Sequence, residues 1–166
     1  MKPGALENRV LVIACGNELR GDDGLGAAAA CRLATRCGPQ VQVCLCHQLT
    51  PDLIEPISEA GLVIFIDASC DGEQAGQIGR TALDQTMVLS PGPLPLTHHA
   101  EPAWLLACCQ AVYGVRPKAL VFSVTASTFD HGQALSGAVT RALPELVEQV
   151  IRSIRGFCSQ KEDCHA

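Results

Sequence analysis

Short apolar runs alternate along this chain with segments of helical periodicity, and that alternation leaves few possible folds. Strands are predicted at Arg9–Ala14, Val41–Cys46, Leu62–Asp67 and Ala119–Val124, with a weaker run at Thr81–Leu89 that we expect at a sheet edge. Helices are predicted at Gly24–Cys37, Thr50–Ala60, Pro102–Val112 and around Leu146–Ile154. Strands separated by helices form a mostly parallel sheet with right-handed crossovers. The sequence therefore predicts an α/β fold, a three-layer α/β/α sandwich whose twisted, mostly parallel sheet has about five strands.

The size and charge of the chain argue against several classes of protein. Its 166 residues suit a single domain, which we place at residues 1–157, with residues 158–166 as a flexible C-terminal tail. The net charge of −5, without a basic run, argues against nucleic acid as a partner. No apolar stretch reaches the roughly 18 residues of a membrane span, and the N-terminus lacks the apolar segment of a signal peptide. We therefore expect a cytoplasmic protein that does not bind membranes.

Ten cysteines raise the question of a disulfide framework or a zinc site. The chain contains no C-x-x-C motif, and the spacing of its cysteines offers little bridging geometry. The segment Cys44-Leu45-Cys46-His47 has potential ligands, but a half-buried strand explains its alternation more simply. We therefore expect free thiols.

A glycine-rich segment between the first strand and the first helix is the most informative part of the chain. It includes Gly16, Asn17 and Gly24. It also holds two acids, Asp22 and Asp23, at the position where a phosphate-binding loop has a helix N-terminus without carboxylates, so that its N–H groups can bind the anion. These acids would repel a phosphate. Carboxylates held by glycines at the mouth of a sheet are instead suitable oxygen ligands for a divalent cation.

Further polar residues are expected at the same edge of the sheet. Asp67 ends the predicted third strand, and Thr97-His98-His99 precedes the helix that begins near Pro102. A lone Asp at a strand end is often a cap or an ion-pair partner, and paired histidines at a helix entry are often surface residues. Two aspartates and one histidine together, however, suit a labile divalent transition metal and leave coordination positions open.

Two other constellations are weaker. A serine triad lacks its G-x-S-x-G elbow, and Ser123 and His131 are poor candidates. The segment Gly24–Ala29 imitates a dinucleotide fingerprint, but it begins inside the predicted helix and follows two acids. A nucleotide function is therefore disfavoured.

The three motifs together resemble the nickel-dependent hydrogenase maturation endopeptidases. They occur in the order Gly16-Asn17-x-Leu19-x-x-Asp22-Asp23-Gly24-x-Gly26, apolar strand with Asp67-Ala68, and Thr97-His98 before a helix. A late segment, Val124–Ser136 running into Ala142–Leu146, is also similar to what many of these proteases carry. The resemblance covers roughly residues 9–155.

The resemblance implies both a fold and a reaction. These proteases have a twisted sheet between helices, and they remove a C-terminal peptide from the large-subunit precursor of a [NiFe] hydrogenase after nickel insertion. Their metal-contacting and catalytic positions fall on Asp23, Asp67 and His98, with Asp22 and His99 as alternatives. Several members have Glu at the position of Asp23, so the carboxylate here is one methylene shorter.

The resemblance also implies that nickel is supplied by the substrate, held on cysteines of the precursor. Hydrolysis would use a water polarised by the metal or by one of the carboxylates, with backbone donors near Gly24 stabilising the oxyanion. Two other functions stay open on the sequence. One is a nickel-sensing chaperone that binds the precursor without cutting it, and the other, more distant, is a nucleotide-binding α/β enzyme.

Overall fold

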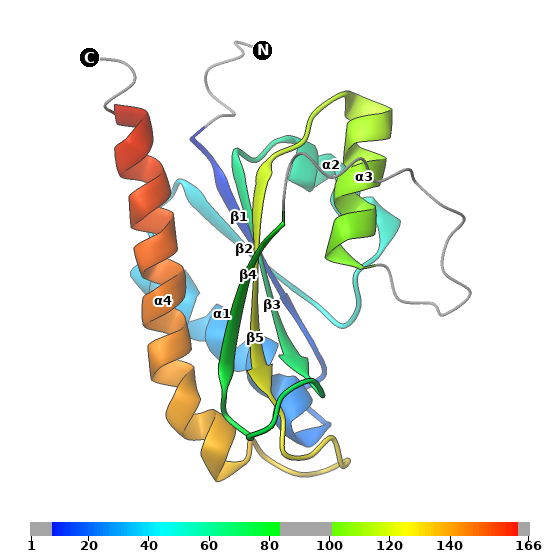
Figure 1. Cartoon of the computed structure of the whole chain (residues 1–166), viewed down its shortest axis with the longest axis vertical. Coiled ribbons are helices and arrows are strands. Elements are labelled where there is room, and N and C mark those ends of the chain that lie inside the picture. Colours follow the sequence, from blue (N-terminus) through cyan, green and yellow to red (C-terminus); the bar gives the residue numbers. More distant parts are fainter. Residues whose placement is uncertain (1–7, 84–100, 163–166) are drawn as a thin grey trace.

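A computed structural model of the protein describes residues 8–83 and 101–162, which form a five-stranded sheet covered by helices (Figure 1). The strands are β1 Val10–Cys15, β2 Val41–Cys46, β3 Leu62–Ser69, β4 Ile78–Leu83 and β5 Lys118–Thr125. Their order across the sheet is β2-β1-β3-β5-β4. β1, β2, β3 and β5 are parallel, whereas β4 pairs antiparallel with β5 at one edge. The predicted fold class and the edge position of the fourth strand are confirmed.

Helices lie on both faces of the sheet and complete the three layers. They are η2 Gly21–Gly24, α1 Leu25–Arg36, η3 Pro51–Leu53, α2 Ile54–Ser58, α3 Pro102–Tyr113 and α4 Gly137–Glu162. α1 and α4 pack on one face, while α2 and α3 pack on the other (Figure 1). Within the described residues, none of these helices is long and apolar enough to cross a membrane.

The core divides into two layers because successive side chains of a strand point to opposite faces. In β1, Val12 and Ala14 face α1 and α4, whereas Leu11 and Ile13 face α2 and α3. The strand is buried on both sides, which explains why its sequence is a continuous apolar run rather than an alternating one.

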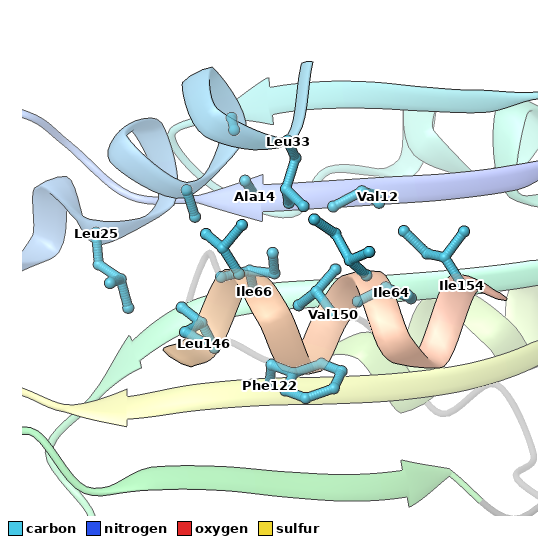
Figure 2. Close-up of a cluster of buried hydrophobic side chains, with 14 of the residues drawn as sticks. Val12, Ala14, Leu25, Leu33, Ile64, Ile66, Phe122, Leu146, Val150 and Ile154 are labelled. Atoms are coloured by element: carbon cyan, nitrogen blue, oxygen red, sulfur yellow. The ribbon is translucent and has the colours of Figure 1, made fainter. Parts of the chain in front are cut away.

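The last helix supplies the apolar stripe that the sequence predicts. Leu146, Val150 and Ile154 lie four residues apart and face the sheet, where they pack with Ile64 and Phe122 (Figure 2). Each fully buried side chain of this size stabilises the fold by roughly 1.5–3 kcal/mol. Helix α4 therefore closes one face of the sheet.

Several boundaries differ from those expected. β3 continues past Asp67 to Ser69, because its pairing with β5 extends to Ser69 opposite Thr125. β4 begins at Ile78 rather than Thr81, and residues 84–89 of the predicted strand lie outside the described residues. α4 begins at Gly137 and runs to Glu162, so residues 158–162, expected to belong to the tail, continue the helix.

Candidate active site

A tight loop follows β1 and carries both predicted aspartates. Gly16 opens it with a φ of +131°, and a Cβ atom there would overlap the backbone carbonyl oxygen of Asp23. The side-chain oxygen of Asn17 accepts a hydrogen bond from the Leu19 N–H at 2.9 Å. The Asn17 N–H donates to Oδ2 of Asp23 at 3.1 Å. Asn17 thus fixes the turn through its side chain, and its backbone N–H orients the Asp23 carboxylate.

Asp22 points into the protein. Its side chain is fully buried, and its carboxylate accepts hydrogen bonds from the backbone N–H groups of Ser127 at 2.6 Å, Thr128 at 3.2 Å and Ser136 at 2.6 Å. Burial raises the pKa of Asp22, but these hydrogen bonds outweigh burial and hold the pKa below its ordinary value. The carboxylate holds the segment after β5 against the first loop, which makes Asp22 a less favourable candidate ligand than Asp23.

The segment after β5 is a part of the site that the sequence reasoning did not assign. Besides donating to Asp22, it lies so close to the first loop that a Cβ atom on Gly21 would come within 2.9 Å of the Thr128 carbonyl oxygen. That carbonyl also accepts a hydrogen bond from the Asp22 N–H at 3.0 Å. The similarity of Val124–Ser136 to the protease family was the signal that could have identified this contact.

Asp23 and Asp67 both lie at the carboxyl edge of the parallel strands. Asp23 is half-buried in η2, which contacts β3, and Asp67 is exposed directly after the buried residue Ile66. Oδ1 of Asp67 accepts a hydrogen bond from the Ala68 N–H at 2.8 Å. In open α/β sheets this edge is where ligands bind. Two carboxylates that reach solvent here have the oxygen donors that a divalent cation prefers.

The predicted histidine falls outside the described residues. His98 and its alternative His99 belong to residues 84–100, for which the structure gives no placement. Among the residues that are described, no group of three or more His, Cys, Asp or Glu side chains could hold a metal ion. The site as described therefore consists of two carboxylates and the loop that orients one of them.

A pair of thiols adjoins these carboxylates. Cys15 and Cys46 end β1 and β2 in register, and their sulfur atoms lie 3.4 Å apart. The hydrogen bond between the thiols, together with burial and the negative charge of Asp67, raises the pKa of Cys15. The same hydrogen bond lowers the pKa of Cys46. The sequence reasoning missed this pair because the predicted first strand ended one residue early, at Ala14.

Neither protein-family models nor curated proteins match this sequence, but solved structures match its fold. The hydrogenase maturating endopeptidase HybD from E. coli is 19% identical, with a TM-score of 0.73, over 89% of this chain and 93% of that one. The [NiFe] hydrogenase maturation protease HycI from Thermococcus kodakarensis KOD1 is also 19% identical, with a TM-score of 0.70 and the same coverage of both chains.

A third match is the hydrogenase 2 maturation peptidase from Thaumarchaeota archaeon SCGC_AB-539-E09. It is 20% identical, with a TM-score of 0.65, over 88% of this chain and 97% of that one. The three matches cover 88–89% of this chain and 93–97% of the matched chains. The chain therefore has the fold of the [NiFe] hydrogenase maturation proteases.

Proposed function

We propose that this protein is an endopeptidase that removes the C-terminal extension from the nickel-loaded large-subunit precursor of a [NiFe] hydrogenase. The observation that carries the proposal is the position of Asp23 and Asp67, which lie at the carboxyl edge of a sheet whose fold matches that of maturation proteases. The expected compartment is the cytoplasm, where such a precursor would be processed before it is assembled.

Asp23, Asp67 and His98 are proposed to contact the nickel ion that the precursor holds on its own cysteines. Nickel is then a feature of the substrate rather than a resident cofactor. Carboxylate oxygens and an imidazole nitrogen are ligands that such an ion accepts when its coordination is incomplete. The hydrogen bond from Asn17 orients the Asp23 carboxylate, as outer partners commonly do for metal ligands.

The proposed reaction is hydrolysis of the peptide bond that this contact brings to the carboxyl edge of the parallel strands. A water molecule polarised by the nickel or by one of the two carboxylates attacks the scissile carbonyl carbon. Backbone N–H groups near Gly24 are proposed to stabilise the oxyanion, because preorganised donors at such a position lower the barrier to acyl transfer. The leaving amine takes up a proton, and the extension dissociates.

The third contact is assigned to His98 rather than His99, on the resemblance alone. Comparing His98→Ala with His99→Ala tests this assignment. Loss of cleavage by the His98 variant, with His99→Ala close to wild type, supports it. The reverse result would move the proposed register by one residue.

The proposal is tested by incubating the protein with nickel-loaded precursor and following the intact mass of the precursor. A peptidase produces a discrete loss of mass at the C-terminus of the precursor, and Asp67→Ala serves as the inactive control. A nickel-sensing chaperone would instead form a complex with the nickel-loaded precursor and leave its mass unchanged. That result would overturn the peptidase assignment.

A further inference from the structure

We propose that Cys15 and Cys46 form a dithiol that a small-molecule disulfide oxidises reversibly to an intrachain cystine at the base of the active-site loop. The proposal concerns a modification site that the peptidase mechanism does not use. It stands on the geometry of the two strands and holds whether or not the protein cleaves a precursor.

The backbone already places the two residues at bridging distance. They are register partners at the ends of adjacent parallel strands, and neighbouring strands lie about 4.7–4.9 Å apart. Disulfides form between Cα atoms roughly 4.4–6.8 Å apart. The sulfur atoms, now 3.4 Å apart, must approach by about 1.4 Å to reach the bonded distance of about 2.05 Å. Side-chain rotation can supply most of that movement.

The neighbouring cysteines lack this arrangement. Cys44 lies on the same face of β2 as Cys46, but its register partner on β1 is Ile13. Cys108 and Cys109 are consecutive residues in α3, a geometry that does not favour a bond between them. Cys44 therefore provides a matched control on the same strand.

The two thiols differ in solvent exposure, and this difference determines which of them reacts first with the small-molecule disulfide. Cys46 is partly exposed, whereas Cys15 is 5% exposed. The Cys46 thiolate attacks one sulfur of glutathione disulfide, the sulfur–sulfur bond breaks, and one glutathione leaves as its thiolate. Once the Cys46 sulfur is bonded to glutathione, it no longer makes the hydrogen bond that is the main cause of the raised pKa of Cys15. The Cys15 thiol then gives its proton to water, attacks the Cys46 sulfur of the mixed disulfide and expels the second glutathione. Two protein thiols are oxidised and one glutathione disulfide is reduced to two glutathiones.

The position of the pair connects it to the active-site loop. Cys15 directly precedes Gly16, whose N–H donates to the Cys46 carbonyl oxygen at 3.0 Å. Gly16 in turn packs against the backbone of Asp23. A bond between the two sulfur atoms thus acts on the first residue of the loop that carries Asp23.

The test equilibrates the whole protein with glutathione redox buffers, blocks remaining thiols by alkylation and maps the cysteine peptides by mass spectrometry. We expect a Cys15–Cys46 link in the wild type and in Cys44→Ser, reversed by dithiothreitol. In Cys15→Ser, oxidation should stop at a glutathione adduct on Cys46. A wild-type protein in which Cys46 keeps a stable glutathione adduct, or in which no link forms under oxidising buffer, would overturn the proposal.

A second measurement tests the connection to the loop. Hydrogen exchange of the backbone amides between Asn17 and Asp23 should differ between oxidised and reduced wild-type protein. The same amides should not respond to the redox buffer in Cys46→Ser. Equal exchange in the two wild-type states would overturn the connection to the loop. Neither measurement depends on cleavage, so its outcome is independent of the proposed peptidase function.

Discussion

Asp22 is a buried charge whose value to the fold can be measured. Asp22→Asn keeps the size of the side chain but turns an amide NH₂ toward backbone N–H donors. Hydrogen bonds to a charged group contribute roughly 1.5–3 kcal/mol each. We therefore expect the free energy of unfolding in urea to fall by about 3 kcal/mol. Asp23→Asn is the control, because the Asp23 carboxylate accepts a backbone N–H from Asn17, whereas the Asp22 carboxylate accepts three such donors. The free energy of unfolding of this control variant should fall by no more than about 1 kcal/mol.

The same carboxylate should make stability depend on pH. Because the folded-state pKa of Asp22 is lowered, its contribution is complete above the ordinary aspartate pKa of about 3.9 and is lost as pH falls through the folded-state value. Urea unfolding from about pH 6 downward should therefore show wild-type stability falling more steeply than that of Asp22→Asn. Parallel curves for the two proteins would contradict this role of Asp22.

Unlike Asp22, Asp67 should matter for cleavage rather than for the stability of the fold. Its side chain is exposed at the edge of the sheet, so Asp67→Ala should change the free energy of unfolding by less than about 1 kcal/mol. We expect the same variant to lose cleavage of nickel-loaded precursor, because the change removes a metal-contacting oxygen rather than packing. Thermal unfolding and the cleavage assay measure the two effects separately. Complete processing by Asp67→Ala would exclude this residue from the mechanism.

Cys15 is not expected to act as the nucleophile of the proposed peptide hydrolysis. The raised pKa of Cys15 keeps its thiol protonated, and a protonated thiol attacks poorly. The main cause of this raised pKa is the hydrogen bond with Cys46.

Cys15→Ala should accordingly preserve turnover within a few-fold in the presence of reductant. The check is the cleavage rate before and after alkylation. Stoichiometric inactivation that maps to Cys15 and disappears in the alanine variant would contradict the prediction.

At the scale of elements, two helical glycines should respond oppositely to the same substitution. A Cβ atom on Gly26 of α1 would overlap the Cys15 carbonyl oxygen, so Gly26→Ala must push the helix away from β1. We expect a loss of about 1–3 kcal/mol in the free energy of unfolding. Gly156 of α4 has open space around its Cα, so Gly156→Ala should stabilise the protein by about 0.5–1 kcal/mol.

Urea unfolding of both variants checks this pair of predictions. Equal effects of the two substitutions would show that helix propensity, rather than the contact between α1 and β1, determines the result. The contact between Gly26 and β1 also accounts for a glycine in Gly24–Ala29, the segment that imitates a dinucleotide fingerprint. Its second glycine allows the helix to approach the strand closely, which needs no nucleotide.

At the scale of the whole molecule, the proposed function predicts that recognition depends on metal carried by the partner. The proposed site of two exposed or half-buried carboxylates and one histidine would bind a metal weakly by itself, because each carboxylate must give up good hydration. We expect the purified protein to contain little nickel by elemental analysis. It should cleave nickel-loaded precursor without added metal and leave nickel-free precursor intact.

The control for this prediction is the nickel-free precursor treated with a strong chelator. Efficient cleavage under those conditions would exclude metal-dependent recognition while leaving the peptidase assignment in place. Restored cleavage after nickel is loaded onto the precursor, but not after nickel is offered to the enzyme alone, would identify the substrate as the source of the metal.

The sequence by itself determined the class of fold and the edge of the sheet at which Asp23 and Asp67 lie. Continuous apolar runs such as Leu62–Ile66 are buried on both faces, and their spacing by helices requires parallel connections. Since the carboxyl ends of parallel strands share one edge, local pattern alone brought Asp23 and Asp67 to it. These features depend on residues close in sequence, which is why periodicity was sufficient.

Only the tertiary structure decided which of two adjacent aspartates is buried and which cysteines pair. Asp22 and Asp23 are adjacent and chemically identical, yet Asp22 accepts its bonds from residues more than a hundred positions away. The pairing of Cys15 with Cys46 depends likewise on the register between two strands. No local pattern encodes such contacts, because they arise when segments distant in sequence pack and their polar groups must find partners.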